Sequence, residues 1–369
     1  MSKATSEGTR RYAQRMNSTV ATGHFHDRDG LYVSSIGLGT YLGHWDDHTD
    51  RSYQEAITRA VDLGCNVIDS AINYRFQRSE RAIGAALDEM FGAGKLARDE
   101  IIIATKAGFF PFDGEPPRDP RAWVTENVVD KGLARPEEIV GGSHAMTPAY
   151  LEDQLARSLE NLGLKTIDIY YVHNPESQLE AVARDEFNNR LRASFEFLER
   201  AAADGRIGIY GTATWNGYRQ QPDSRGYLSL ADIISIAREV AGDGHHFRAV
   251  QLPYSLAMPE ALTEANQTVE GEPLSFLMAA DRLGVTVMCS ASMMQARLSQ
   301  NLPAFVGQAL KGLTTDAQRA IQFVRSTPGV TTALVGMGQR THVDENMAVA
   351  AVAPAPVEEF FSMFSSEQP

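Results

Sequence analysis

The sequence predicts an α/β protein folded as a single (β/α)8 barrel, and three observations support this. Eight short apolar runs alternate with eight amphipathic helical segments from residue 34 onward. Several runs are apolar on both faces, as expected for parallel strands that are buried on both sides. No G-x-G-x-x-G motif follows an early strand, so the direct sign of a doubly wound dinucleotide-binding sheet is absent. One closed barrel therefore accommodates the eight units more economically than an open sheet.

Each expected strand is a short apolar run bounded by polar residues or glycine. The strands are expected at residues 35–40, 66–70, 101–106, 167–173, 207–212, 249–253, 285–290 and 332–336. The helices, which place apolar residues on one face, are expected at residues 50–63, 79–91, 147–162, 184–203, 228–241, 272–283, 314–326 and 342–352. Thr147 and Pro148 suit the start of one helix, and Gly163 suits its end.

The remaining segments divide the chain around the barrel. Residues 26–33 contain a turn signal between two extended pieces and predict a β-hairpin that closes the bottom of the barrel. A long connection, residues 107–146, follows the third strand and is rich in glycine, proline and aromatic residues. We expect one barrel domain at residues 24–355, an N-terminal extension at residues 1–23 that could be flexible, and a C-terminal tail at residues 356–369.

Composition excludes several classes of protein. The chain has 34 basic and 47 acidic residues, a formal charge of −13, which argues against a nucleic-acid partner. No apolar run approaches the length of a membrane span, and the polar start lacks the apolar core of a secretory signal. Cys65 and Cys289 lie in apolar runs and are expected to be buried, reduced thiols. We therefore expect a cytoplasmic protein with no membrane partner, whose oligomeric state is left open.

Four ionisable residues lie at or just beyond the carboxyl ends of neighbouring strands: Asp69, Tyr74, Lys106 and His173. Any one of them alone would be interpreted as a strand cap, but active sites of such barrels lie at this face. Lys106 would place a charge in the mouth of the barrel, and Asp69 on the neighbouring strand could be its partner. We expect the ammonium to lower the pKa of Tyr74 and a histidine to orient a carbonyl oxygen. Such a set suits proton donation during hydride reduction of a carbonyl.

These residues lie in motifs that resemble the aldo-keto reductase family over about residues 30–352. The most specific motifs are Gly37-Leu38-Gly39-Thr40, Asn66-Val67-Ile68-Asp69-Ser70-Ala71-Ile72-Asn73-Tyr74 followed by Ser79-Glu80-Arg81-Ala82-Ile83-Gly84, then Thr105-Lys106, and Asp168-Ile169-Tyr170-Tyr171-Val172-His173. The resemblance implies a TIM barrel, a nicotinamide cofactor, usually NADPH with NADH as an alternative, and reduction of a small-molecule aldehyde or ketone. It makes Tyr74 the general acid, Asp69 and Lys106 its tuning pair, and His173 the group that orients the substrate.

The same resemblance implies a set of cofactor-binding residues. These are Gly39, Thr40, Asp69, Thr214, Gln251, Ser290, Gly336, Gly338, Arg340, His342, Glu345 and Asn346. The chain departs from the family pattern in three places. Ala213-Thr214 replaces a Ser-Asn pair, and Cys289 replaces an aromatic residue. Gly338 and His342 stand where basic residues usually bind the 2′-phosphate, with Arg340 nearby. Either Arg340 binds that phosphate or the selectivity for NADPH is weakened, and the sequence leaves both open.

Aromatic residues near the same face are expected to form the substrate pocket. They are Tyr41, Trp45, Phe109, Phe110 and Trp123, the last three from the long connection. Histidines at positions 24, 26, 44, 48, 245 and 246 have no cysteine or carboxylate at metal-binding spacing, so we expect surface histidines and no metal site.

Two other functions remain open from the sequence. The altered carboxamide and phosphate contacts are compatible with a cofactor-sensing or partner-binding regulatory subunit that has vestigial chemistry. The four ionisable residues could also serve a non-redox acid–base step, such as dehydration or cyclisation in a biosynthetic pathway.

Overall fold

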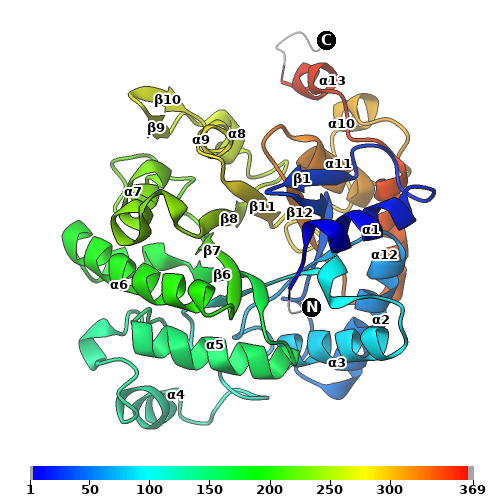
Figure 1. Ribbon diagram of the computed structural model, residues 1–369. Coiled ribbons are helices and arrows are strands. Elements are labelled where there is room, and N and C mark those ends of the chain that lie inside the picture. Colours follow the sequence, from blue (N-terminus) through cyan, green and yellow to red (C-terminus); the bar gives the residue numbers. More distant parts are fainter. Residues whose placement is uncertain (1–2, 365–369) are drawn as a thin grey trace.

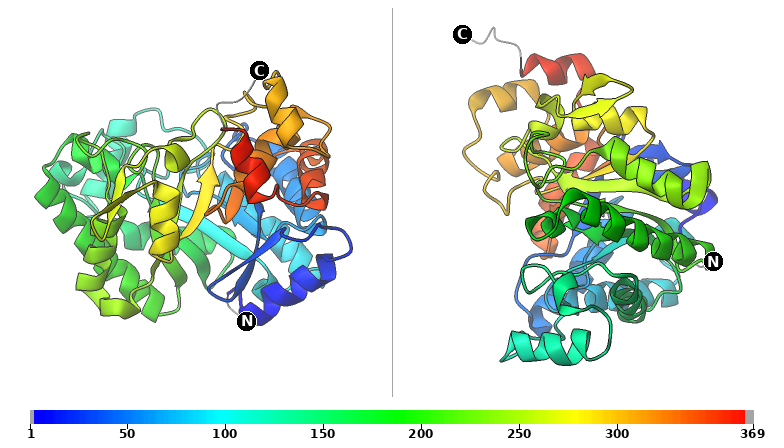
Figure 2. Two further views of the ribbon diagram at one scale, coloured as in Figure 1. Left: turned by 90° about the horizontal axis from the view of Figure 1, so that it is seen from above. Right: turned by 90° about the vertical axis from the view of Figure 1, so that its left-hand side faces the viewer.

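A computed structural model describes residues 3–364, and it confirms the predicted barrel. Eight parallel strands close on themselves in the order β11-β12-β3-β4-β5-β6-β7-β8. The barrel strands are β3 Ile36–Gly39, β4 Val67–Asp69, β5 Ile102–Ala107, β6 Ile167–His173, β7 Ile207–Ala213, β8 Phe247–Pro253, β11 Thr286–Ser290 and β12 Thr332–Gly336. Helices surround this barrel, as Figures 1 and 2 show. Every expected strand is present, with ends shifted by two residues at most.

The surrounding helices bury one face against the strands. They are α2 Asp47–Asp62, α3 Arg78–Gly92, α5 Pro148–Leu162, α6 Arg184–Ala203, α7 Leu230–Ala241, α9 Phe276–Arg282, α11 Asp316–Ser326 and α12 Arg340–Met347, the last followed by a 3₁₀ turn at Ala348–Ala351. Helix α5 has the predicted ends: the Thr147 side chain accepts a hydrogen bond from the Tyr150 amide, and Gly163 has a φ of 64°.

One expected helix, residues 272–283, is wrong in its first part. Residues Glu272–Leu274 form strand β10, which pairs with β9 Gln267–Val269 in an antiparallel hairpin, and only Phe276–Arg282 is helical. Glu270 and Gly271, with φ angles of 53° and 82°, form the tight turn that joins β9 to β10, and this turn directs residues 272–274 into the hairpin. Ser275 then caps α9 by accepting a hydrogen bond from the Met278 amide.

The predicted N-terminal hairpin is present as β1 Phe25–Arg28 and β2 Leu31–Ser34. Asp29 and Gly30, at its turn, both have positive φ angles of 50° and 79°, as a tight two-residue hairpin turn requires. The Ser34 amide donates to the side chain of Asn66, which directly precedes β4. The hairpin is thereby held against the amino-terminal ends of the strands, opposite to the face that bears the ionisable residues.

The N-terminal extension is packed, so the expectation that it could be flexible is wrong for the described residues. Helix α1 (Ser6–Met16) buries Tyr12 completely, and the Tyr12 hydroxyl donates to the Val61 carbonyl at 2.5 Å. Arg11 forms an ion pair with Asp99 at 2.8 Å. The Ala4 amide donates to the Asp168 carboxylate at 2.7 Å. These long-range contacts leave no local signature in a polar segment, and the proposed domain boundaries stay a prediction.

The C-terminal tail contains a short helix, α13 (Val357–Ser362), whose Phe360 is buried against Phe323. Cys65 and Cys289 are buried free thiols, as expected. None of the helices within residues 3–364 is long and apolar enough to cross a membrane.

The long connection after β5 folds into a unit with its own small core, which we call the insertion (residues 107–146). It contains α4 (Pro120–Val124), one turn of π-helix (Thr125–Val129) and one turn of 3₁₀-helix (Pro136–Glu138). Its core consists of Phe110, Val128, Ala134 and Ala145, packed against Tyr150 of α5. Helix α4 lies beside α5, outside the ring of helices (Figures 1 and 2).

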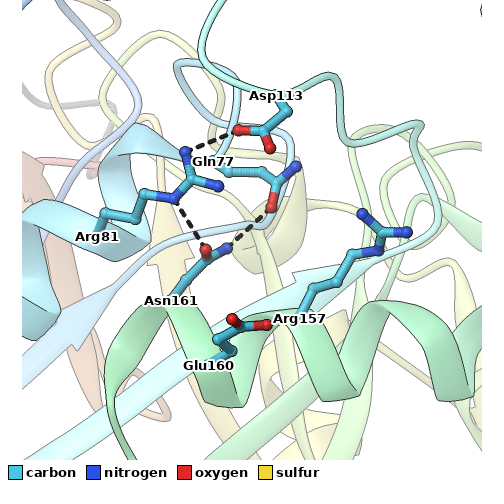
Figure 3. A pocket seen from close by; sticks show the side chains of 6 residues that line it. All are labelled: Gln77, Arg81, Asp113, Arg157, Glu160 and Asn161. Atoms are coloured by element: carbon cyan, nitrogen blue, oxygen red, sulfur yellow. Dashed lines mark hydrogen bonds and ion pairs between the residues drawn. The ribbon is translucent and has the colours of Figure 1, made fainter.

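A polar groove marks where the insertion meets the barrel (Figure 3). Arg81 of α3 forms an ion pair with Asp113 of the insertion at 2.7 Å and donates to Asn161 of α5 at 3.0 Å. Asn161 donates in turn to Gln77, whose amide donates to the Pro111 carbonyl at 2.9 Å. The groove is therefore a docking contact between α3, α5 and the insertion, formed by side chains that bind one another.

His24 is the main exception to the expectation of surface histidines. Its ring is fully buried, with Nε2 2.9 Å from the Gly64 carbonyl and Nδ1 3.1 Å from the Ser35 hydroxyl. Arg325, which donates to Ser35, lies nearby. Burial, and next the charge of Arg325, lowers the pKa of His24 from 6.5 to about 3. His24 is therefore a neutral core residue at neutral pH.

We expect His24 to make the protein sensitive to acid. Between pH 6.5 and about 3 the unfolded chain binds a proton at His24 that the folded chain does not. The free energy of unfolding therefore decreases as the pH is lowered through this range. This residue alone contributes up to about 1.4 kcal/mol per pH unit in that window. Thermal unfolding of wild type and His24→Gln at pH 7.5 and pH 5 measures it. A loss of melting temperature on acidification that is equal in the two proteins would contradict the assignment.

Candidate active site

The barrel brings the four predicted ionisable residues together. Asp69, Lys106 and His173 lie at the carboxyl ends of β4, β5 and β6, which are neighbours in the barrel. Lys106 is in register with Tyr171, two residues before His173. Tyr74 follows β4 in a turn, where its amide donates to the Ala71 carbonyl at 2.9 Å. The positions of Asp69, Lys106 and His173 at strand ends, and of Tyr74 in the turn after β4, were visible in the sequence and make the four residues converge.

Asp69 and Lys106 form a buried ion pair, with Nζ 2.7 Å from Oδ2 and both side chains almost inaccessible to solvent. Lys106 Nζ also donates to the Ser70 carbonyl at 2.6 Å. The other carboxylate oxygen of Asp69 accepts from the Gln251 amide at 2.7 Å. Burial raises the pKa of Asp69 and lowers the pKa of Lys106, and the attraction between the two charges opposes both shifts.

The environment of Tyr74 differs from the expectation. The ammonium of Lys106 lies over the face of the Tyr74 ring, 5.0 Å from its centroid, and its two hydrogen bonds go to Asp69 and Ser70. The pKa of Tyr74 lies well above 10 because the phenol is buried, with the charge of Asp69 and the neighbouring Tyr41 adding to the shift. The expected lowering of this pKa by Lys106 is therefore wrong. Tyr74 keeps its proton at neutral pH.

His173 faces Tyr74 from β6. The two rings meet edge to face with centroids 6.0 Å apart, and the ring of Phe109 packs on His173 at 5.0 Å. Burial, followed by the charge of Lys106 and then His144, lowers the pKa of His173 well below 6.5. The neutral ring has one nitrogen that can donate a hydrogen bond. Within residues 3–364, His173 Nδ1 is buried without a hydrogen-bond partner.

Several predicted cofactor residues lie at the ends of the strands around this site, and one of them has a buried polar atom without a partner in the described part of the chain. Thr214 directly follows β7, is 5% exposed, and its Oγ1 has no hydrogen-bond partner within the described chain. Its amide donates to the carbonyl of Gln251 on β8 at 2.8 Å, so Thr214 and Gln251 are adjacent. Thr40, after β3, is buried and donates to the Asp69 carbonyl at 3.1 Å. Ser290 ends β11 and is half-buried.

The adenosine side of the expected site lies after β12. Gly336 and Gly338 lie in tight places, because a Cβ would come within 3.3 Å of Leu42 at Gly336 and within 3.1 Å of Tyr53 at Gly338. Arg340 begins α12 and is exposed. His342 and Glu345 are also exposed, whereas Asn346 is buried. The exposed backbone at Gly336, a Thr214 hydroxyl with no partner among the described residues and an exposed arginine fit a dinucleotide that carries phosphates.

The predicted pocket aromatics divide into two groups. Tyr41 and Trp45 are 56% and 48% exposed, and Tyr41 contacts the Tyr74 ring at 5.0 Å. Phe109 contacts His173. In contrast, Phe110 and Trp123 pack in the core of the insertion, with ring centroids 6.3 Å apart, so the expectation that they line the pocket is wrong. The aromatic rings at positions 110 and 123 stabilise the core of the insertion instead.

Sequence reasoning missed three further residues near the site. Phe76 contacts Trp45 at 5.2 Å, and Trp215 follows Thr214 and is 49% exposed. The Trp215 amide is held by the buried carboxylate of Glu176 at 2.7 Å. His144, from the end of the insertion, contacts His173. Trp215 lies just beyond the end of β7 and Phe76 lies two residues after Tyr74, and these positions could have identified both from the sequence. No sequence signal identifies His144. No group of three potential metal ligands occurs within residues 3–364.

Known proteins resemble this chain in sequence. A "D-threo-aldose 1-dehydrogenase" of Pseudomonas sp is 30% identical over 186 residues, 49% of this chain, and the chain spans 50% of that relative's length. A protein of Arabidopsis thaliana named "Probable voltage-gated potassium channel subunit beta" is 22% identical over 341 residues, 89% of this chain and 90% of its own.

Solved structures share the fold. An aldo/keto reductase from Klebsiella pneumoniae, solved with NADP and acetate, superposes with a TM-score of 0.61 at 20% identity and covers 95% of this chain and 98% of its own. A sequence model of the Aldo/keto reductase family matches residues 35–223, more than half of the chain. The match includes the strands that bear Asp69, Lys106 and His173. The chain belongs to the aldo/keto reductase family.

Proposed function

We propose that the protein is a nicotinamide-dependent reductase that converts a small aldehyde or ketone to an alcohol. The observation that supports this best is the convergence of a protonated Tyr74, a neutral His173 and the buried Asp69–Lys106 ion pair at one end of the barrel. Membership of the aldo/keto reductase family, which indicates an oxidoreductase, also supports this proposal.

In this proposal, the substrate carbonyl oxygen accepts hydrogen bonds from the Tyr74 hydroxyl and from the ring of His173. A bound nicotinamide cofactor supplies the hydride. Negative charge develops on the substrate oxygen as the carbonyl is reduced, and Tyr74 transfers its proton to that oxygen. Lys106, over the Tyr74 ring, stabilises the phenolate that remains, and Asp69 and the Ser70 carbonyl hold the ammonium in place.

The cofactor we propose is NADPH, with NADH as an alternative. Thr214 and Gln251 would hold the carboxamide. Gln251 donates to Asp69 of the ion pair, Thr214 is adjacent to Gln251, and Thr214 Oγ1 has no hydrogen-bond partner within residues 3–364. Arg340 would bind the 2′-phosphate, because it is exposed at the start of α12. The solved relative from Klebsiella pneumoniae, which holds NADP, supports this choice. The other members of the proposed set are Gly39, Thr40, Asp69, Ser290, Gly336, Gly338, His342, Glu345 and Asn346.

The Thr214 hydroxyl gives a direct test of the cofactor site. We expect Thr214→Val to raise the Kd of NADPH about 3- to 10-fold, because one hydrogen bond to the carboxamide is lost. Thr214→Ser keeps the hydroxyl and should bind NADPH like wild type. Fluorescence titration of the three proteins measures this effect. Equal affinity in wild type and Thr214→Val would remove Thr214 from the site.

Titration with NADPH and NADH, followed by turnover on a panel of aldehydes and ketones, tests the proposed function itself. Tight binding with steady turnover supports the reductase. Binding without turnover on any carbonyl would instead favour a cofactor-sensing subunit, and chemistry without cofactor would favour a non-redox acid–base enzyme. The cytoplasmic location expected from the sequence stays a prediction.

A further inference from the structure

The end of the insertion places one histidine directly behind His173. His144 lies in a short antiparallel contact, where its amide donates to the Val140 carbonyl at 3.1 Å and the Ala145 amide donates to the Gly108 carbonyl at 3.0 Å. The side chain of His144 is 1% exposed. The two ends of the insertion are thus joined beside the carboxyl end of β6, and this join fixes the backbone of His144.

Both ring nitrogens of His144 have partners that define the protonation of the ring. Nε2 lies 2.7 Å from the backbone carbonyl of His173, which can only accept, so Nε2 is the donor. Nδ1 lies 2.8 Å from the amide nitrogen of Gln178, which donates to it. The Gln178 oxygen accepts from Arg190 at 2.6 Å, which fixes the orientation of that amide. Burial lowers the pKa of His144 to about 4, in agreement with a neutral ring.

The contact between His144 and His173 depends on a glycine. A Cβ on Gly108 would lie 2.7 Å from His144 Nε2 and 2.9 Å from the His173 carbonyl oxygen, and Gly108 has a φ of 143°. Phe109, the next residue, packs its ring against both histidine rings, at 5.1 Å from His144 and 5.0 Å from His173. Only a residue without a side chain permits this approach at position 108.

His173 depends on these contacts because its own ring has little else to fix it. Its Nδ1 is buried without a hydrogen-bond partner within the described residues. The next residue, Asn174, adopts a left-handed conformation with a φ of 43°, so the chain turns sharply away from the barrel there. The orientation of the ring therefore follows from the packing of Phe109 and Tyr74 and from the anchored backbone carbonyl.

We propose that His144 is a positioning residue for His173: through the hydrogen bond to its carbonyl and the shared contact with Phe109, it sets the angle at which the His173 ring meets the substrate carbonyl. This inference rests on the proposed reductase function. It gives the insertion a role in catalysis that does not require contact with the substrate, because His144 acts through His173. Gln178 and Arg190 anchor His144 to α6.

The test compares His144→Leu, which removes both hydrogen bonds, with His144→Gln, which retains an amide donor. We expect His144→Leu to lower kcat about 10- to 100-fold, as loss of a group that orients a reacting residue does, with the Kd of NADPH unchanged. His144→Gln should recover most of kcat. Val128→Ala, which opens a cavity in the insertion core away from His173, is the matched control and should stay within twofold of wild type.

The ¹⁵N signals of the His173 ring, recorded on the full chain, separate this proposal from the proposed function. His144→Leu should shift and broaden them, and Val128→Ala should not. An unchanged kcat in His144→Leu, or an equal loss of kcat in Val128→Ala, would overturn the positioning role while the reductase stands. If His144→Leu shifts the His173 signals but the wild-type protein reduces no carbonyl, the reductase function is overturned and the structural coupling between the two histidines stands. If His144→Leu does not fold, Gln178→Met is the second variant. It removes the hydrogen bond to His144 Nδ1 and the one from Arg190, and it leaves His144 Nε2 paired with the His173 carbonyl. It should lower kcat about 3- to 10-fold, and wild-type kcat there would overturn the proposal.

Discussion

Tyr74→Phe should lower carbonyl reduction by about 10²- to 10⁴-fold, because it removes the proton that the proposed mechanism transfers to the substrate oxygen. The substitution keeps the ring, and with it the contacts to Lys106, Tyr41 and His173. Folding and the Kd of NADPH are therefore expected to stay as in wild type. Single-turnover oxidation of bound NADPH with an aldehyde in excess measures the chemical step directly.

Tyr210→Phe is the matched control for this substitution. Tyr210 is fully buried, and it packs with Phe195 and Phe247 between the barrel and its helices, away from Lys106. Removal of its hydroxyl should leave the rate of reduction unchanged. A Tyr74→Phe enzyme that reduces the aldehyde as fast as the Tyr210→Phe enzyme would show that Tyr74 is not the proton donor.

Lys106→Met should have the second large effect, on both activity and stability. We expect activity to fall by about 10²- to 10³-fold, because nothing then stabilises the charge left on Tyr74. The free energy of unfolding should fall by about 3–5 kcal/mol, because Asp69 is left as an unpaired buried carboxylate. Urea unfolding and steady-state reduction measure the two effects on the same protein.

The double variant Asp69→Asn/Lys106→Met separates them. The double variant has no unpaired buried charge, so most of the lost stability should return. The Gln251 amide can still donate to the side chain at position 69. Activity should stay as low as in Lys106→Met. Additive losses of stability in the double variant would mean that the ion pair does not exist in solution, and recovered activity would exclude the role of Lys106.

The sequence predicted the features that depend on local pattern. Alternating apolar runs identified every barrel strand, and the polar residues that end them identified Asp69, Lys106 and His173, because parallel strands in a barrel direct their carboxyl ends to one face. The turn at Asp29-Gly30 identified the hairpin for a similar reason, since the φ angles of a tight turn restrict the residues that can form it.

Features that depend on distant contacts were missed or misjudged. The pKa of Tyr74 is raised first by burial of the phenol and then by the charge of Asp69 and by Tyr41, and the spacing of these residues in the sequence does not reveal that environment. Phe110 looked like a pocket residue because its position after β5 is right, yet its ring packs in the insertion core. His144 stands 29 residues before its partner His173, in a segment with no regular periodicity.

The closure of the barrel has a consequence during synthesis. Strand β12 pairs with β3, and the Thr332 hydroxyl donates to the Ser34 carbonyl across 298 residues of sequence. A ribosome that adds about 5–20 residues per second needs roughly 15–60 s to make the intervening chain. During that time the free edge of β3 exposes unpaired amides and carbonyls, which attract other unfinished chains. The nascent chain should therefore depend on chaperones until β12 has left the ribosome and can pair with β3.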